Sequence, residues 1–348
     1  MKLFFSLVGI LLASLVGLFL LINNSQTGTD IIRNPLSIEA LPSPSPFLFE
    51  ELTIPYLRSR EYKSSLGRLE KYSDNGNYTS YLTNYTSDGL KVNGLLTVPD
   101  GEKPESGFPA IVFIHGYIPP TTYSTVEKYV DYVNFLSRNG YVVFKIDLRG
   151  HGKSEGEPGG AYYSSDYVID TLNAYSALQN SDFINPKKIG LWGHSMAGNI
   201  VLRGLAARSE IPAASIWAGA GFTYLDLSEY GIQDGSYRPP SENAARQRKR
   251  QLLREAYGDP SSGNPFWKLV SPTDYLKDYQ GAIQLNHAIN DEVVNIGYSR
   301  DLNQFLGTTN IPHELNELPS GGHNITDPSF TPAMQKTVEF FDHYLKSR

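Results

Sequence analysis

Short apolar runs alternate with amphipathic stretches over most of the chain beyond residue 108. Six runs are apolar enough for strands buried on both faces: 110–115, 141–147, 188–192, 213–217, 282–287 and 312–318. Between them, apolar positions recur at helical spacing in 126–138, 166–179, 196–208, 296–305 and 333–346. Strands that alternate with helices in this way predict an α/β fold with a mostly parallel central sheet and helices on both faces.

Two segments depart from this alternation. Residues 78–86 and 90–98 alternate apolar and polar positions around the turn residues at 87–89, which predicts an N-terminal β-hairpin. Residues 221–272 are too long for a crossover connection and too varied for a linker, so they predict a small cap inserted over the sheet. Its aromatic residues are expected to shape an apolar pocket: Phe222, Tyr224, Tyr230, Tyr237, Phe266 and Trp267.

One part of the predicted cap, 244–256, carries five basic residues around Leu252 and Leu253: Arg246, Arg248, Lys249, Arg250 and Arg254. The pattern predicts an amphipathic helix. Its basic face could meet anionic lipid or an acidic substrate group, or it could simply be solvated.

The first residues follow another pattern. Leu3 to Ile22 is a run of 20 uncharged, mostly apolar residues, long enough to span a bilayer, and no good small-x-small cleavage site follows it. Residues 1–22 are therefore predicted to be a transmembrane anchor, with a cleaved secretion signal as the alternative. The proline-punctuated residues 23–46 are predicted to be a linker to one globular domain, 47–348. Lys2 places the N-terminus in the cytoplasm and the domain on the extracytoplasmic side.

Composition excludes several classes of function. The net charge of -6 and the absence of a basic stripe argue against nucleic acid as a partner. With no cysteine, the chain has no disulfide, thiolate zinc site or cysteine nucleophile. No pair of His, Asp or Glu residues has the spacing of a metal site on a helix face, so neither a metal nor a cofactor is predicted.

Two serines stand in glycine-flanked motifs typical of a nucleophile elbow. Ser154 lies in Gly-Lys-Ser-Glu-Gly, which fits the strict G-x-S-x-G pattern, whereas Ser195 lies in Gly-His-Ser-Met-Ala and departs from it at Ala197. An elbow needs a buried strand running into it and a helix leaving it. The runs 188–192 and 199–208 supply both to Ser195, but the glycine- and proline-rich residues after Ser154 cannot begin a helix. Ser195 is therefore the predicted nucleophile.

A serine hydroxyl becomes a good nucleophile when an imidazole takes its proton and a carboxylate orients that imidazole. Asp291 follows the predicted strand 282–287 and is the expected acid. Its alternatives are a role as a local helix cap, the adjacent Glu292, and the more distant Asp226.

His323 follows the last predicted strand and a glycine-rich turn, which makes it the expected base. His194 precedes the nucleophile and is expected to help position it. His287 and His313 fall within predicted strands as structural residues, and His343 is expected to be solvated.

The oxyanion of the reaction needs two hydrogen-bond donors. An elbow supplies the first from the residue after the nucleophile, here the Met196 backbone N–H. The second is expected from the Tyr117 N–H, because Gly116 permits a sharp turn after the strand 110–115.

From residue 78 to the C-terminus, the chain resembles the α/β-hydrolase superfamily. Within it, the chain resembles the catalytic domain of prolyl oligopeptidases and acylaminoacyl peptidases and its dienelactone-hydrolase-like relatives. The resemblance rests on the turn at His115-Gly116, on Asp147-Leu148-Arg149-Gly150-His151-Gly152-Lys153-Ser154, on the Ser195 elbow, and on Ser271-Pro272, Asp291-Glu292-Val293-Val294 and Gly322-His323. It departs at Ala197, where glycine is usual, and at Asn295, where proline is common. In that family the loop of Ser154 is structural.

The resemblance implies a serine hydrolase, either an esterase or a serine-type peptidase. The thirty or so residues between the linker and the hairpin leave no room for the β-propeller of prolyl oligopeptidases. The expected substrate is therefore a small ester or a short peptide. The alternative is a non-catalytic, membrane-tethered binding protein with the same fold.

Overall fold

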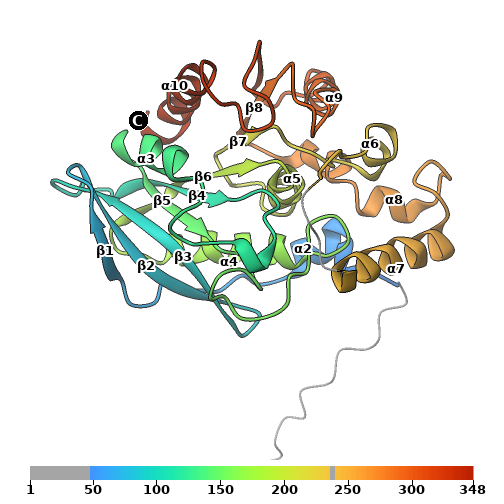
Figure 1. Ribbon diagram of the computed structural model, residues 1–348, viewed down its shortest axis with the longest axis horizontal. Coiled ribbons are helices and arrows are strands. Elements are labelled where there is room, and N and C mark those ends of the chain that lie inside the picture. The colour runs from blue at the N-terminus through green and yellow to red at the C-terminus, as the bar shows by residue number, and fades with distance from the viewer. Residues whose placement is uncertain (1–47, 236–239, 348) are drawn as a thin grey trace, which may run out of the picture. The chain divides into compact units, whose positions relative to one another are not determined.

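The computed structural model describes residues 48–235 and 240–347. Within them, nine strands form one sheet in the order β1-β2-β3-β5-β4-β6-β7-β8-β9 (Figure 1). The strands are β1 (Glu70–Asp74), β2 (Tyr78–Ser87), β3 (Leu90–Pro99), β4 (Phe108–Ile114), β5 (Val142–Ile146), β6 (Ile184–His194), β7 (Ala213–Trp217), β8 (Ala282–Ala288) and β9 (His313–Leu318). The last six pair in parallel, and the first three pair antiparallel and join the rest through β3 and β5. The predicted parallel sheet and hairpin are confirmed.

Helices cover both faces of the sheet. One face packs against α2 (Ile54–Ser59), α4 (Asp166–Gln179), α5 (Ala197–Ala207) and α9 (Gly297–Leu306), and the other against α3 (Val130–Arg138) and α10 (Phe330–Phe341). Alternate residues of the central strand β4 divide between these two cores: Val112 and Ile114 face the first, and Ile111 and Phe113 face the second. Successive side chains of a strand point to opposite faces, so a strand covered on both sides reads as an unbroken apolar run.

Three local features differ from the sequence-based expectation. The edge strand β1 and the short helix α2 were not predicted. The helix predicted over 126–138 begins only at Val130, because Tyr129 has a left-handed backbone with φ of 59°. A right-handed helix cannot extend through a residue in that conformation.

The segment predicted as a cap carries three helices between β7 and β8. They are α6 (Tyr224–Glu229), α7 (Pro240–Tyr257) and α8 (Pro265–Leu269). Leu253 of α7 packs against Phe266, Trp267 and Val270, and also against Leu52 from the start of the domain. This small apolar cluster, separate from the two cores on the sheet, holds α7 beside the domain.

The predicted membrane anchor (1–22) and linker (23–46) lie outside the described residues. Among residues 48–235 and 240–347, no helix is both long and apolar enough to cross a membrane.

Candidate active site

Ser195 occupies a sharp turn between β6 and α5. Its backbone has φ of 57°, a left-handed conformation that is strained for a residue with a side chain. The turn is fixed by two hydrogen bonds, from the Ser195 N–H to the Trp217 carbonyl (2.9 Å) and from the Gly198 N–H to the Ser195 carbonyl (2.9 Å). Strand and helix thus enter and leave the serine as an elbow requires.

The two glycines of this motif are needed for close packing. A Cβ on Gly193 would lie 2.7 Å from a methyl group of Val201, and a Cβ on Gly198 would lie 2.8 Å from the Gly219 Cα. The Ala197 methyl group, which replaces the usual glycine, is accommodated in the core. The departure from the strict pattern therefore leaves the elbow intact.

The structure brings Ser195, His323 and Asp291 together at the carboxyl edge of the parallel strands. The Nε2 atom of His323 lies 2.9 Å from the Ser195 Oγ, and its Nδ1 atom lies 2.8 Å from the Asp291 Oδ2. The three residues follow β6, β9 and β8, respectively. This is the hydrogen-bonded order of nucleophile, base and acid that acyl transfer requires.

Asp291 is held as a carboxylate. Its Oδ1 accepts hydrogen bonds from the backbone N–H groups of Val293 (2.8 Å) and Val294 (2.9 Å), and its side chain is fully buried. Burial alone would raise the pKa of Asp291, but hydrogen bonds from His287 and His323 hold this pKa well below its usual range. Asp291 is therefore both a local cap, through Oδ1, and the partner of the histidine, through Oδ2.

The rival acids lie elsewhere. Glu292 is exposed, and Asp226 forms the capping box of α6 with Thr223. His287, predicted to be structural, is buried and bonded at both ring nitrogens, but its Nε2 also lies 3.3 Å from the Asp291 Oδ2. Sequence reasoning missed this contact, although the spacing of four residues was the available signal.

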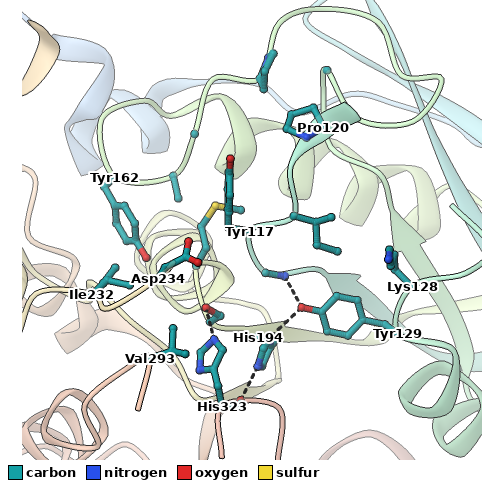
Figure 2. A pocket seen from close by; sticks show the side chains of 18 of the residues that line it. Tyr117, Pro120, Lys128, Tyr129, Tyr162, His194, Ile232, Asp234, Val293 and His323 are labelled. Carbon is teal, nitrogen blue, oxygen red and sulfur yellow. Dashed lines mark hydrogen bonds between the residues drawn. The ribbon is translucent and has the colours of Figure 1, made fainter. Parts of the chain in front are cut away.

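A second series of hydrogen bonds passes through Tyr129 and His194 (Figure 2). The Gly116 N–H donates to the Tyr129 hydroxyl (2.9 Å), which lies 2.8 Å from the His194 Nδ1, and the His194 Nε2 lies 2.9 Å from the His323 carbonyl oxygen. Burial lowers the pKa of His194 to about 3, so its ring is neutral. A neutral ring carries one proton, on Nε2, where it is donated to the His323 carbonyl, and Nδ1 accepts from Tyr129. His194 thus ties the turn at Gly116 to the loop of His323.

Comparison with known proteins finds similar peptidases and esterases. A family model described as serine aminopeptidase, S33, matches residues 108–233. Dipeptidyl peptidase 8 of Homo sapiens is 26% identical over 249 residues, 70% of this chain and 26% of that protein, so the chain spans about a quarter of its length. Acylaminoacyl peptidase of Pyrococcus horikoshii superposes with a TM-score of 0.60 at 21% identity, over 78% of this chain and 43% of that one. Acetyl xylan esterase of Paenibacillus sp. R4 also superposes with a TM-score of 0.60, at 15% identity, over 82% of this chain and 91% of that one.

The domain has the α/β-hydrolase fold. As the sequence predicts, it is similar to the catalytic domain of the prolyl oligopeptidase and acylaminoacyl-peptidase group.

Ser154 of the hydrolase domain lies in a different environment. Its Oγ accepts a hydrogen bond from the Asn93 N–H (2.9 Å), and its own N–H donates to the His151 carbonyl (2.9 Å). The strand-to-helix turn that exposes Ser195 is missing here, because residues 154–160 form no helix. Ser154 therefore fastens its loop to β3.

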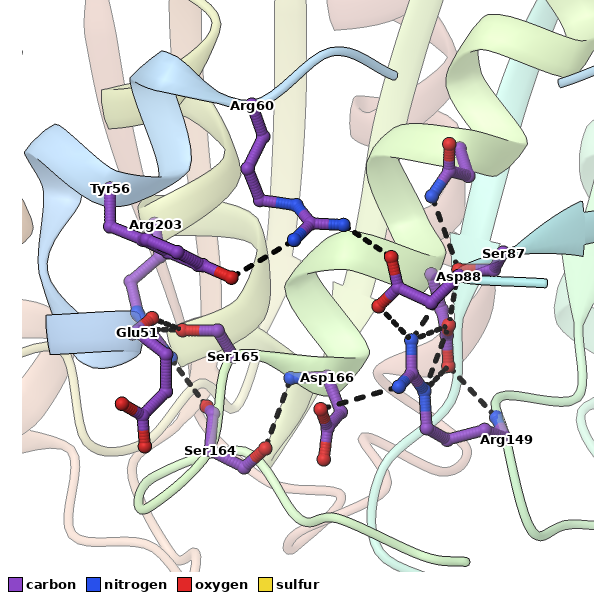
Figure 3. A network of polar contacts seen from close by, with 12 residues as sticks. Glu51, Tyr56, Arg60, Ser87, Asp88, Arg149, Ser164, Ser165, Asp166 and Arg203 are labelled. Atoms are coloured by element: carbon purple, nitrogen blue, oxygen red, sulfur yellow. Dashed lines mark hydrogen bonds and ion pairs between the residues drawn. The ribbon is translucent and has the colours of Figure 1, made fainter. Parts of the chain in front are cut away.

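The loop of Ser154 is anchored by Arg149 in a network of polar contacts (Figure 3). The Arg149 guanidinium lies 2.7 Å from Asp170, 3.2 Å from Asp88 and 3.3 Å from Asp166. The Arg149 N–H also donates to Asp170 (2.9 Å), whose other oxygen accepts from the Ser87 hydroxyl (2.6 Å). Because the Asp170 side chain is fully buried, its charge depends on these partners.

A cavity of about 1430 Å³ opens above Ser195 and His323. Met196 and Tyr117, the residues predicted to supply the oxyanion donors, both line it, as do Tyr162 and Tyr163. None of the described cap aromatics that were predicted to shape a pocket lines this cavity. Phe222, Tyr224 and Trp267 line a second cavity of about 390 Å³, Phe266 packs in the cap cluster, Tyr230 bonds to Asp301, and Tyr237 lies outside the described residues.

Proposed function

We propose that the protein hydrolyses ester or amide bonds of small acyl substrates through an acyl-enzyme on Ser195. The observation that carries this proposal is the hydrogen-bonded series Ser195, His323 and Asp291, of which Ser195 and His323 line the large cavity. The remaining residues of the proposed site are the two oxyanion donors, the Met196 and Tyr117 N–H groups.

The chemistry follows from these positions. The Ser195 Oγ attacks the carbonyl carbon as the His323 Nε2 takes the hydroxyl proton, and Asp291 stabilises the imidazolium that forms. The tetrahedral intermediate collapses, the bond to the leaving group breaks, and His323 returns the proton to the departing oxygen or nitrogen. Water, deprotonated by His323, then attacks the acyl-serine, and the acid and free Ser195 are released.

Support for this substrate class comes from the cavity and the relatives. Both an esterase and peptidases are among the similar structures, and the cavity is large enough for an acyl group with a bulky leaving group. Substrate choice between the two bond types depends on leaving-group protonation, because an amine must receive a proton before it departs whereas a phenolate need not.

The test compares an ester and an anilide that share one acyl group, using the full-length protein in detergent and Ser195→Ala to correct for contaminating hydrolases. We expect ester cleavage with a burst equal to the enzyme concentration, the sign of an acyl-enzyme. Comparable anilide cleavage would make the protein a peptidase. Cleavage of neither, over a panel of acyl lengths, would overturn the proposal.

We also propose that residues 1–22 anchor the hydrolase domain to a membrane, with the domain on the extracytoplasmic side. The support is the uncharged apolar run from Leu3 to Ile22 behind Lys2. The test is extraction with alkaline carbonate, which releases peripheral proteins. We expect the full chain to stay with the membrane and a variant with two charged residues in the run to be released or secreted. Release of the parent chain would contradict the anchor.

A further inference from the structure

Helix α7 presents two cations to the active-site cavity. Arg246 and Lys249 line the cavity and are half-buried, whereas Arg248 and Arg250 on the same helix are exposed. Residues 246, 249 and 253 are spaced i, i+3 and i+7, which places them on one face of a helix. At Leu253 this face packs into the cap cluster, so at Arg246 and Lys249 the same face is directed over the cavity.

The two cations have no described counter-ion. The guanidinium of Arg246 lies over the rings of Tyr162 and Tyr163, with 5.9 Å to each ring centroid, and among the described carboxylates none forms an ion pair with Arg246 or Lys249. Stacking on two aromatic rings holds a guanidinium in place and leaves its N–H edge open to a ligand.

The carboxylates that border the same cavity do not cancel this charge. Asp131, Glu157 and Asp327 are exposed, where water screens them. The two half-buried ones are already engaged: Asp166 pairs with Arg149, and Asp234 also makes a polar contact. The half-buried cations that a bound substrate would meet are therefore Arg246 and Lys249 of α7, together with Lys128, which also lines the cavity.

We propose that Arg246 and Lys249 form a subsite for an anionic group of the substrate, a carboxylate or a related oxyanion, remote from the bond that is cleaved. The inference rests on the proposed hydrolase function and specifies its substrate class. The cavity volume of about 1430 Å³ exceeds that of most small-ligand sites, about 300–1,000 Å³, and so accommodates a substrate that extends from Ser195 to α7. Arginine suits this task because its planar fork matches a carboxylate.

The test measures selectivity with matched p-nitrophenyl esters. One series carries a terminal methyl group on the acyl chain and the other a terminal carboxylate, over several chain lengths. A second pair places the carboxylate on the leaving group. For each pair, the ratio of kcat/KM for the anionic ester to that for the neutral ester is measured in the full-length protein, in Arg246→Ala/Lys249→Ala, and in the control Arg248→Ala/Arg250→Ala, which removes the same charge from the exposed face.

We expect the anionic ester to be preferred at one chain length or on one side of the scissile bond. This ratio should fall about 10- to 100-fold in Arg246→Ala/Lys249→Ala, mainly through KM, and should change less than threefold in the control. Charge reversal by Arg246→Glu should invert the preference. Equal ratios in the parent and Arg246→Ala/Lys249→Ala, or an equal fall in the control, would overturn the subsite while hydrolysis stands. Cleavage of no ester by the parent would overturn the proposed function itself and the inference with it.

Discussion

The domain contains two loops, those of Ser195 and Ser154, in which small residues flank a serine in a similar motif. The two loops have different structural surroundings. At Ser195 the chain turns from a buried strand into a helix, the serine backbone is left-handed, and a histidine lies against the hydroxyl. At Ser154 the hydroxyl accepts a backbone N–H, and the loop is secured by Arg149 and buried Asp170. A glycine-flanked serine motif is therefore not enough to identify a nucleophile. Ser195 differs from Ser154 because it lies between a buried strand and a helix and because a histidine contacts its hydroxyl.

The largest difference between the two loops is expected when the hydroxyl groups of Ser195 and Ser154 are removed in turn. Ser195→Ala is expected to lower kcat for an ester by about 10⁴-fold or more, because no nucleophile remains. Ser154→Ala is expected to change kcat less than threefold and to lower stability by about 1 kcal/mol, through the lost hydrogen bond to Asn93. Steady-state kinetics and urea unfolding measure the two effects. If the large loss of kcat occurred in Ser154→Ala instead, the assignment of the two loops would be reversed.

Removing Arg149 should affect folding and leave the chemistry intact. Arg149→Met leaves the buried Asp170 carboxylate without its cation, and we expect the free energy of unfolding to fall by about 3–5 kcal/mol. Ester turnover per folded molecule should stay near the parent value. The control is Arg300→Met, which removes an exposed ion pair with Glu317 and should change stability far less. Equal losses in the two variants would contradict the anchoring role of Arg149.

The domain should be sensitive to mild acid through its buried histidines. Burial lowers the pKa values of His194 and His115 to about 3 from an unfolded value of 6.5, so the unfolded chain binds more protons between these limits. Stability from these residues is therefore complete above pH 6.5 and is lost as pH falls toward 3, at up to about 1.4 kcal/mol per pH unit for each histidine.

This slope is measured by urea unfolding at several pH values between 6.5 and 5. Replacing His194 with Gln removes one titrating group and should reduce the slope. An unchanged slope in His194→Gln would show that the ring is not held neutral.

The smallest expected effect on activity comes from removing the Tyr129 hydroxyl, which links the turn at Gly116 to His194 beside the nucleophile. Tyr129→Phe removes the hydroxyl that joins the Gly116 N–H to His194. We expect kcat to fall about tenfold with KM nearly unchanged, because this hydroxyl positions catalytic groups and is not needed to hold the substrate. Tyr78→Phe, which removes a hydroxyl bonded to Asn134 of α3, is the control, because neither residue lines the cavity. A matching loss in both variants, or a rise in KM alone, would argue against positioning.

The parts of the fold that sequence predicts are those with strong periodicity. The parallel strands are apolar throughout, because helices cover both faces, and their boundaries agree with prediction to within a few residues. Strand β1 was missed because its residues are almost all exposed, so it lacks an alternating apolar signal. The late start of α3 depends on one left-handed residue, Tyr129, which no local pattern marks.

The proposed site was predictable where local context and chain order sufficed. Ser195, Asp291 and His323 each follow a predicted strand, and parallel strands end at one edge of the sheet. The contacts that join Gly116, Tyr129 and His194 depend on how separate loops pack, which no local pattern shows. The same holds for the aromatic lining of the cavity, which comes from residues 117, 129, 132, 162, 163 and 330 and not from the predicted cap aromatics.

The most direct test of the account is covalent labelling of the full-length protein with a fluorophosphonate, which reacts with serines activated by a neighbouring base. The adduct is located by peptide mass spectrometry in the parent, Ser195→Ala and Ser154→Ala. The account predicts one adduct per chain, on Ser195, that is absent from Ser195→Ala and retained in Ser154→Ala. An adduct on Ser154, or no adduct on Ser195 in the folded parent protein, would contradict it.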